Sequence, residues 1–231
     1  MLFRSLVERL VTVDLLPQAE ELLQHQVDQR LEGVAKAAVS TRLALIYLLD
    51  KQPSKALSVI RTSKQTRLPD ELIEQRDLIE ARALADTRSF DQALDLIASN
   101  TSPEADRLRA DIYWDSQRWS DAAAKTEALL GDKYTDAVPL TDVDRMDLMR
   151  ACVGYSLAGD AASLERLRTR FDSKMASSPD AKAFAMVTHA PDVSSEDYKT
   201  YVKRLASVDT LDAFLTDFKA KYGNIGKTAT N

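Results

Sequence analysis

Two stretches of the sequence decide the fold: residues 42–63, RLALIYLLDKQPSKALSVIRTS, and residues 77–100, DLIEARALADTRSFDQALDLIASN. Each stretch reads as an apolar helix, a short polar turn and a second helix. Each also carries two alanines 12 residues apart, one in either helix. Because a small residue at a crossing lets antiparallel helices approach to about 8–10 Å, we expect these alanines to lie between the two helices. The pairs are Ala44 with Ala56 and Ala81 with Ala93.

The turns inside these stretches carry helix-start signals. Pro53 suits the first turn of a helix, because its missing N–H has no partner to lose there. Ser89 is followed three residues later by Gln92, a spacing typical of a capping box. Since one hairpin cannot bury its own apolar face, several hairpins have to stack.

Three weaker copies of the same hairpin extend the pattern. Residues 109–130 hold Ala110 and Ala122 at the same interval, and residues 15–23 hold the second half of an opening copy around Ala19. The last copy carries Cys152, Tyr155 and Leu164. Five equivalent positions are separated by 37, 37, 29 and 42 residues, and they are Val7, Ala44, Ala81, Ala110 and Cys152.

This pattern resembles the tetratricopeptide repeat, whose period is about 34 residues. The resemblance covers roughly residues 1–172. It implies an all-α fold: a right-handed α-α superhelix of about five helical hairpins, followed by C-terminal capping helices. We expect the hairpin array over residues 1–178, the capping helices over residues 179–222 and a flexible tail over residues 223–231.

The periodicity also predicts where each helix begins and ends. The last predicted helix has an apolar stripe, which we interpret as a cap on the end of the array, with a partner-binding face as the alternative. The stripe comprises Leu211, Phe214, Leu215, Phe218 and Tyr222. The predicted helices are 3–13, 17–30, 34–49, 53–64, 70–86, 90–99, 102–116, 120–130, 142–158, 161–174, 180–189, 194–206 and 210–222.

Composition excludes several classes of protein. The 231 residues carry a net charge of −5, and the arginines alternate with acids, whereas a nucleic-acid binder usually has a basic face. No apolar run reaches about 18 residues, so we expect no membrane span. The first 16 residues are not typical of a signal peptide, because acids interrupt them. The compartment stays open: cytoplasmic, or periplasmic if the chain belongs to a larger exported protein.

No motif for catalysis or metal binding emerges. The single cysteine, Cys152, fills a small-residue slot, and the two histidines lie far from it in the sequence. The run Gly154 to Ala158 resembles a nucleophile elbow, but it lies inside a helical period rather than between a strand and a helix. Asp142, Asp144 and Asp147 do not fit a calcium loop, and we interpret them as acids at a helix start. We therefore predict a protein that is not an enzyme and has no cofactor or metal.

The resemblance also implies a binding face. In the family, side chains at positions 2, 5, 9 and 12 of the first helix of each hairpin line a concave groove. On the third and fourth hairpins these positions include arginine and tryptophan, which are frequent interface anchors. Packing against neighbouring helices is the alternative that the sequence leaves open. The candidate groove residues are Gln75, Arg82, Arg107, Asp111 and Trp114.

These observations predict a non-enzymatic protein–protein interaction module or scaffold of bacterial type, which could be a segment of a larger tetratricopeptide-repeat protein. Its partner would be a protein or peptide with acidic and aromatic or aliphatic side chains, bound in the groove. The alternative is a structural or oligomerisation domain, a homo-oligomer that uses the apolar N-terminal edge and the final helix as subunit contacts. That edge comprises Leu2, Phe3 and Leu6. A helical enzyme would need a pocket with clustered titratable residues, for which the sequence gives no signal.

Overall fold

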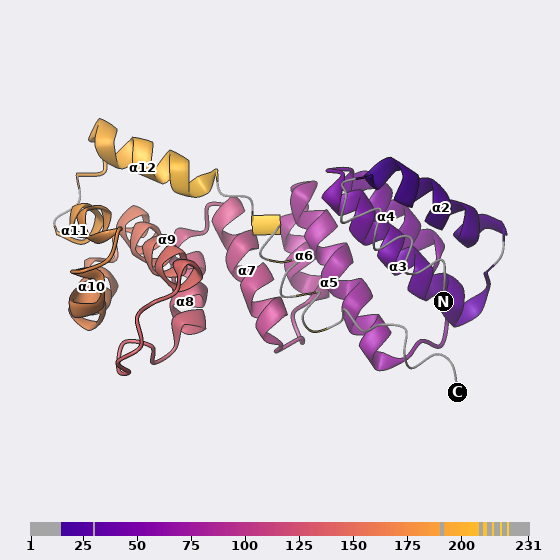
Figure 1. The fold of residues 1–231 in the computed structure, drawn as a ribbon, viewed down its shortest axis with the longest axis horizontal. Coiled ribbons are helices and arrows are strands. Elements are labelled where there is room, and N and C mark those ends of the chain that lie inside the picture. The colour runs from indigo at the N-terminus through magenta and orange to yellow at the C-terminus, as the bar shows by residue number, and fades with distance from the viewer. Residues whose placement is uncertain are drawn as a thin grey trace. The chain divides into compact units, whose positions relative to one another are not determined.

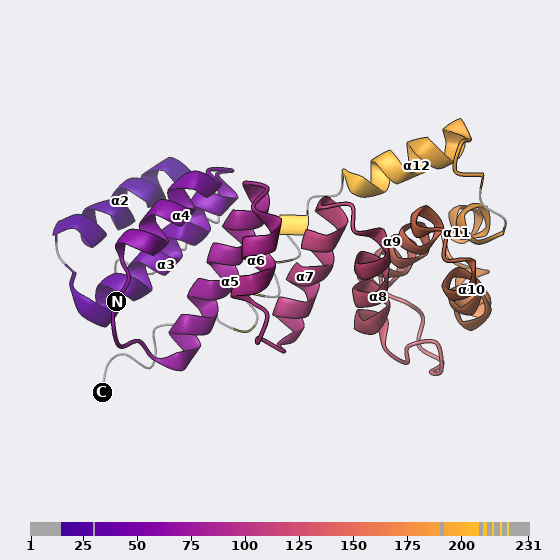
Figure 2. The same ribbon diagram turned by 180° about the vertical axis from the view of Figure 1, so that it is seen from behind.

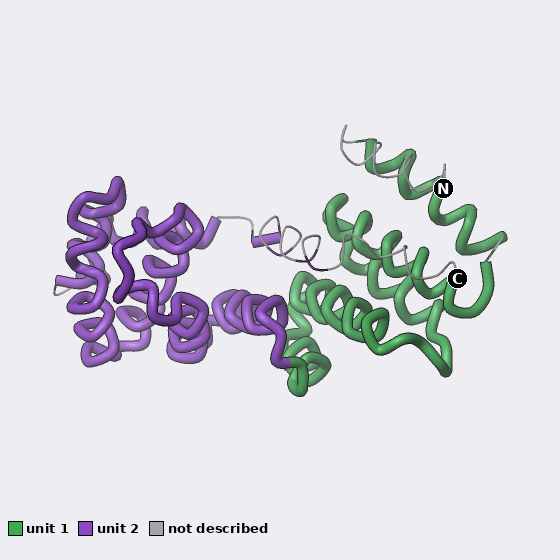
Figure 3. The backbone as a smooth tube through the Cα atoms, turned by 60° about the horizontal axis from the view of Figure 1, so that its bottom comes forward, with its two compact units in different colours: residues 1–100, 222–231 green, residues 101–221 purple. Residues whose placement is uncertain are grey.

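The computed structural model describes residues 15–29, 31–189 and 192–207, together with the five positions 210, 211, 214, 218 and 221. Over this part of the chain the fold is all-α, with eleven helices and no strand. The chain divides into two compact units, residues 1–100 with 222–231 and residues 101–221 (Figure 3). The boundary at residue 100 falls inside the predicted array of residues 1–178. The predicted helix 3–13, with the N-terminal edge, lies outside the described residues.

Unit 1 consists of successive helices that each pack on the next one in the chain (Figure 1). In addition, α3 packs directly on α5, so that the first helices of two successive hairpins are in contact. The contact between α4 and α5 joins the same two hairpins a second time. The helices are α2 (Leu16–Gln29), α3 (Gly33–Leu49), α4 (Pro53–Thr62), α5 (Asp70–Asp86) and α6 (Phe90–Leu96).

Unit 2 is built around α9, which packs on α8, α10 and α11 (Figure 2). The contact between α8 and α9 is the most extensive in the unit, and α12 packs on α11. For α2 to α12 the predicted helix ends agree with the structure to within two residues, except that α6 ends three residues early. The helices are α7 (Pro103–Asp115), α8 (Trp119–Leu130), α9 (Asp142–Ala158), α10 (Ala161–Met175), α11 (Ala181–Thr188) and α12 (Glu196–Ala206).

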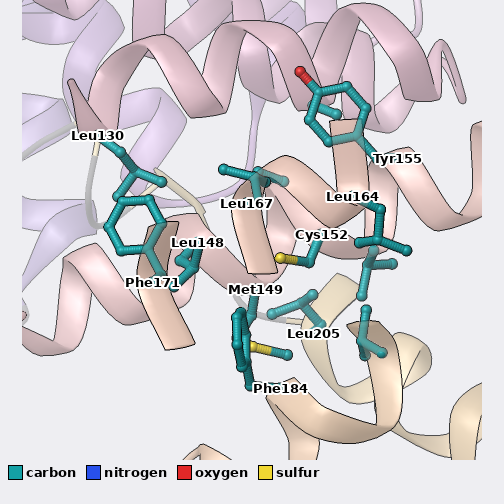
Figure 4. Packing of buried hydrophobic residues seen from close by; sticks show 14 of the residues in the cluster. Leu130, Leu148, Met149, Cys152, Tyr155, Leu164, Leu167, Phe171, Phe184 and Leu205 are labelled. Atoms are coloured by element: carbon teal, nitrogen blue, oxygen red, sulfur yellow. The ribbon is translucent and has the colours of Figure 1, made fainter. Parts of the chain in front are cut away.

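The small residues spaced 12 apart form the inner face of the hairpins, as predicted. All of them are almost completely buried. Cys152, the equivalent residue in the last hairpin, is packed among Met149, Leu164 and Leu167 (Figure 4). The buried small residues are Ala44, Ala56, Ala81, Ala93, Ala110 and Ala122.

The four hairpin turns in the described part of the chain share one backbone geometry. In each turn a residue with positive φ follows the first helix, and it lies seven positions after the buried small residue of that helix. The following amide closes the turn on a carbonyl five residues earlier, for example Gln52 N to Tyr47 O at 2.7 Å. This bond is typical of the Schellman motif, which satisfies the last carbonyls of a helix. The positive-φ residues are Lys51, Arg88, Gln117 and Gly159.

The helix caps confirm some sequence signals and overturn others. The hydroxyl of Ser102 accepts from the amide of Ala105, and Thr141 forms a capping box with Asp144, as the sequence indicates. The predicted box at Ser89 is wrong, since Ser89 makes no side-chain cap bond. The positive-φ turn holds Ser89 at ψ 56°, outside the extended region that an N-cap residue adopts.

The start of α12 also differs from the prediction. Its cap is Ser195, whose hydroxyl accepts from the amide of Tyr198 at 3.2 Å. Ser194, the predicted start, instead bonds the carboxylate of Asp192 through its amide and its hydroxyl. The helix therefore begins one residue later than the Ser194–Asp197 pattern indicates.

A buried arginine joins the first helix of one hairpin to the hairpin before it. From α5, Arg76 donates through Nη1 to Ala37 O at 3.0 Å and to Thr41 Oγ1 at 3.2 Å. Through Nη2 it donates to Ile60 O at 2.6 Å and to Ser63 Oγ at 3.1 Å. The last two acceptors lie at the C-terminal end of α4, where a cation is favourable. Burial lowers the pKa of the Arg76 guanidinium from its usual range.

Candidate partner-binding site

The five candidate groove residues fall into two sets, one in each unit. Gln75 and Arg82 lie on α5 of unit 1. Gln75 is buried, and its Oε1 accepts no hydrogen bond within the described part of the chain. Arg82 is 7% exposed and pairs with Asp86 on its own helix at 3.0 Å. The other three residues lie on α7 of unit 2.

The candidates on α7 are held by α9. Arg107 donates from both terminal nitrogens to the carboxylate of Asp147, at 3.1 and 3.0 Å. One turn further along, Arg150 donates to Asp111 Oδ1 at 2.7 Å. The guanidinium of Arg150 also lies 5.0 Å from the centre of the Trp114 ring. Two ion pairs and one cation–π contact therefore connect the two helices, and α7 supplies the cation of one ion pair and the anion of the other.

Helical periodicity explains why these side chains meet. Residues four and seven positions apart lie on one face of a helix, and Arg107, Asp111 and Trp114 have this spacing on α7. Asp147 and Arg150, three positions apart on α9, present the opposite order of charge. These three side chains of α7 therefore contact a neighbouring helix. Trp114 is 6% exposed, and its ring makes a T-shaped contact with the ring of Trp119, with centroids 5.3 Å apart.

Two residues of this network were missed in the sequence. The prediction that Asp147 is an acid at the helix start is wrong, because Asp147 lies in the second turn of α9 and pairs with Arg107. Arg150 carried no prediction. The sequence does contain a signal for these pairs, because residues of opposite charge follow Arg107 and Asp111 at distances of 40 and 39 positions.

Glu104, three positions before Arg107 on α7, pairs with a residue of the C-terminal segment. Lys221 donates from Nζ to Glu104 Oε2 at 3.1 Å. The described apolar residues of that segment, Leu211, Phe214 and Phe218, are 6%, 2% and 4% exposed. Burial of the stripe is thus confirmed for these three, whereas Leu215 and Tyr222 lie outside the described residues. The ion pair places Lys221 at the first turn of α7.

The other groups that the sequence singled out serve packing and capping. Cys152 is completely buried, and burial raises the pKa of its thiol (Figure 4). Ser156 lies inside α9 and accepts a hydrogen bond from Tyr198 at 2.9 Å. Asp142 pairs with Arg145, three residues further along the helix.

The described ranges show no group of three histidine, cysteine, aspartate or glutamate side chains placed to hold a metal ion. Within the same ranges, no helix has both the length and the apolar character that crossing a bilayer requires. Comparisons with protein-family models, with curated proteins and with solved structures give no significant match to this chain.

Proposed function

We propose that the chain is a protein-interaction module without enzymatic activity, built as a right-handed superhelix similar to tetratricopeptide repeats. The observation that carries the proposal is the common register of four hairpins. In each one a buried small residue is followed seven positions later by the same positive-φ turn. Repetition of one packing unit produces an extended surface, and such surfaces commonly serve to bind proteins or peptides.

The first helices of the hairpins would carry the binding face. In unit 1 these are α3 and α5, which pack on each other. In unit 2 they are α7 and α9, connected by the ion pairs of Arg107 and Arg150. Because those side chains already have partners, the preference for acidic ligands based on Arg107 is weaker than the sequence indicates. A partner would instead depend on the half-buried apolar side chains of the face, such as Leu45 and Met146.

A pair of leucines allows a direct test. Leu45 lies on α3 and Leu57 on α4, and both are half-buried in the same hairpin. We suggest replacing each in turn with a photo-crosslinking amino acid in the full chain and irradiating it in extract of the native cell. The proposal requires that the same protein crosslinks from position 45 and not from position 57. Equal labelling from both positions, or labelling only from position 57, would reject the first-helix face.

A further inference from the structure

The loop between α8 and α9 is longer than the corresponding connections before α5 and α7. It comprises residues 131–141, whereas residues 63–69 connect α4 to α5 and residues 97–102 connect α6 to α7. Figure 2 shows this loop extending beyond the end of α8. Long loops on a rigid scaffold often carry binding residues, so the contacts of this loop bear on function.

Side chains of α10 hold the loop in place. Lys174 donates from Nζ to Asp136 Oδ1 at 2.6 Å and to Val138 O at 2.7 Å. The ring of Tyr134 makes a T-shaped contact with the ring of Phe171, with centroids 5.8 Å apart. The side chain of Val138 nevertheless remains on the surface, because this residue is 65% exposed. The loop thus presents an apolar side chain to solvent on a backbone that is already fixed.

Arg170, one turn before Lys174 on α10, has an open hydrogen-bonding edge. Arg166 donates to Glu127 through Nε at 3.2 Å and Nη2 at 2.7 Å, whereas Arg170 donates to it through Nη1 at 3.4 Å. Among the described residues, Nε and Nη2 of Arg170 have no hydrogen-bond partner, and the side chain is 40% exposed. Its guanidinium is positioned over the Tyr134 ring, 4.9 Å from the centre. Two parallel N–H groups on one edge of a guanidinium suit bidentate binding of a carboxylate.

The charge of this cluster favours a ligand with one negative charge. Although burial opposes ionisation of Glu127, hydrogen bonds from Arg166 and Tyr155 hold the pKa of its carboxyl below the usual range. Two arginines and one carboxylate leave a net charge of +1 in the cluster. A single carboxylate balances that charge, whereas the second negative charge of a phosphate would be repelled by Glu127.

We propose that α10 and the loop of residues 131–141 form a binding surface for a protein segment in which an aspartate or glutamate lies close to an aliphatic side chain. The carboxylate accepts hydrogen bonds from Nε and Nη2 of Arg170, and the aliphatic side chain covers Val138. Lys174 holds the Val138 carbonyl one helical turn beyond Arg170, so a few residues of a partner reach both anchors. Because both anchors are fixed before binding, little ordering cost is added. This surface lies on a second helix and a loop, and it is separate from the first-helix face proposed above.

A peptide selection on the full chain tests the proposal. The probe is a library of short random peptides displayed on phage, depleted first on the Arg170→Glu chain and then selected on the wild type. Enriched peptides should carry an aspartate or glutamate within a few positions of a leucine, isoleucine or valine. Fluorescence anisotropy of the most enriched peptide should show a Kd raised at least about tenfold by Arg170→Glu. Val138→Ser should raise it roughly fivefold, through the loss of apolar area.

Two variants of the same unit are matched controls, and circular dichroism checks that every chain is folded. Arg168→Glu changes an arginine of α10 that pairs with Glu165, and Val193→Ser changes another exposed valine. Both should bind the peptide as the wild type does.

A charge exchange gives a second readout. Replacing the acid of the selected peptide by lysine should abolish binding to the wild type and restore binding to the Arg170→Glu chain. The proposal is overturned if no peptide is enriched, if the enriched peptides lack an acid, or if Arg168→Glu weakens binding as much as Arg170→Glu does. Crosslinking from Leu45 tests the first-helix face alone, so either proposal can fail while the other stands.

Discussion

Arg150 on α9 donates a 2.7 Å hydrogen bond to Asp111 on α7, and both side chains are almost completely buried. A buried ion pair gains its attraction in a medium of low dielectric constant, but both charges have lost their hydration. Its main consequence is therefore specificity: either charge left alone would be strongly unfavourable. In the neighbouring pair the arginine, Arg107, lies on α7 and the aspartate, Asp147, lies on α9. A shift of one helix along the other by one turn would therefore bring like charges together.

This relationship predicts a non-additive mutant cycle. Arg150→Met or Asp111→Leu alone should lower the free energy of unfolding by about 3–5 kcal/mol, because each leaves one buried charge without its main partner. The double variant should lose much less than the sum of the two single losses. Urea denaturation of the four proteins measures the coupling. Additive losses would show that the two charges do not depend on each other.

The hairpin turns predict stabilising substitutions to glycine. The backbones of Lys51, Arg88 and Gln117 have φ between 54° and 62°, a region that costs a residue with a Cβ roughly 1–2 kcal/mol. Glycine avoids that cost but loses about 0.5–1 kcal/mol through the greater freedom of the unfolded chain. Each change to glycine should therefore raise the unfolding free energy by up to about 1 kcal/mol. Thermal and urea midpoints measure the gain.

The control for the turn prediction is alanine at the same positions. Lys51→Ala keeps the Cβ and should bring no gain. Gly159 occupies the equivalent turn with φ 70°, and a Cβ added there would meet no atom within 4 Å. Gly159→Ala should therefore be destabilising by about 1 kcal/mol through its backbone alone. A gain from Lys51→Ala equal to that from Lys51→Gly would contradict this explanation.

Gly154 predicts a steric effect of a different origin. A Cβ at this position would lie 2.9 Å from Ala123 Cβ and 3.1 Å from Trp119 O, at the contact between α8 and α9. Gly154→Ala should therefore cost about 1–3 kcal/mol by overpacking, even though alanine favours a helix. Combining it with Ala123→Gly should recover part of the loss. If Gly154→Ala were stabilising, the two helices would have to separate more easily than the packing indicates.

Whether a feature of this molecule can be predicted from the sequence depends on how far apart in the chain the interacting residues lie. The buried alanines were predictable, because side-chain size and helical period are local properties. The turn at Gly159 was also readable as a glycine after a helix. Its three counterparts were not, since lysine, arginine and glutamine carry no preference for positive φ. The wrong prediction of a capping box at Ser89 has the same origin. The capping pattern of Ser89 is local, but the turn before Ser89 sets its backbone conformation.

The candidate site depended on longer-range interactions. Periodicity correctly places Arg107, Asp111 and Trp114 on one face of α7. Whether that face meets solvent depends on α9, about 40 residues later, and on the rotation of that helix. The steps between the last hairpins are unequal, 29 and 42 residues. Aligning the hairpins at a fixed period therefore does not bring Asp147 and Arg150 opposite their partners on α7. The same holds for Lys221, whose partner Glu104 lies 117 positions earlier.

Arg76 predicts that lysine cannot replace arginine in unit 1. The guanidinium reaches acceptors on both α3 and α4 with two nitrogens, whereas an ammonium group is a single point of donation. Arg76→Lys should lower the unfolding free energy by about 1–3 kcal/mol, because acceptors at one of the two sites lose a buried donor. Arg67→Lys, at an exposed position before α5, is the matched control and should change nothing measurable. Equal stability of both variants in urea would show that a lysine satisfies the site.

Glu20 predicts a pH-dependent gain in stability. Burial, followed by the charge of Asp50, raises the pKa of Glu20 in the folded protein above its usual range. The folded state then binds this proton more tightly than the unfolded state, so that stability falls as the pH rises through the raised pKa. Above that pKa the folded protein bears the full cost of holding Glu20 as an ionised, partly buried carboxylate. Glu20→Gln removes it and should raise the unfolding free energy at pH 7 by no more than about 1 kcal/mol, because the carboxylate is half-exposed.

The comparison of two pH values separates this effect from a general effect of glutamine. Near pH 4 the carboxyl of Glu20 is largely protonated in the folded protein, and the advantage of Glu20→Gln over the wild type should shrink. Gln52, which donates to Glu20 at 3.4 Å, can donate equally to a glutamine oxygen, so the hydrogen bond is kept. Glu21→Gln, at an exposed neighbouring position on α2, is the matched control. Thermal midpoints of the three proteins decide the matter: a Glu20→Gln advantage that is the same at both pH values would mean that the carboxyl charge is not its cause.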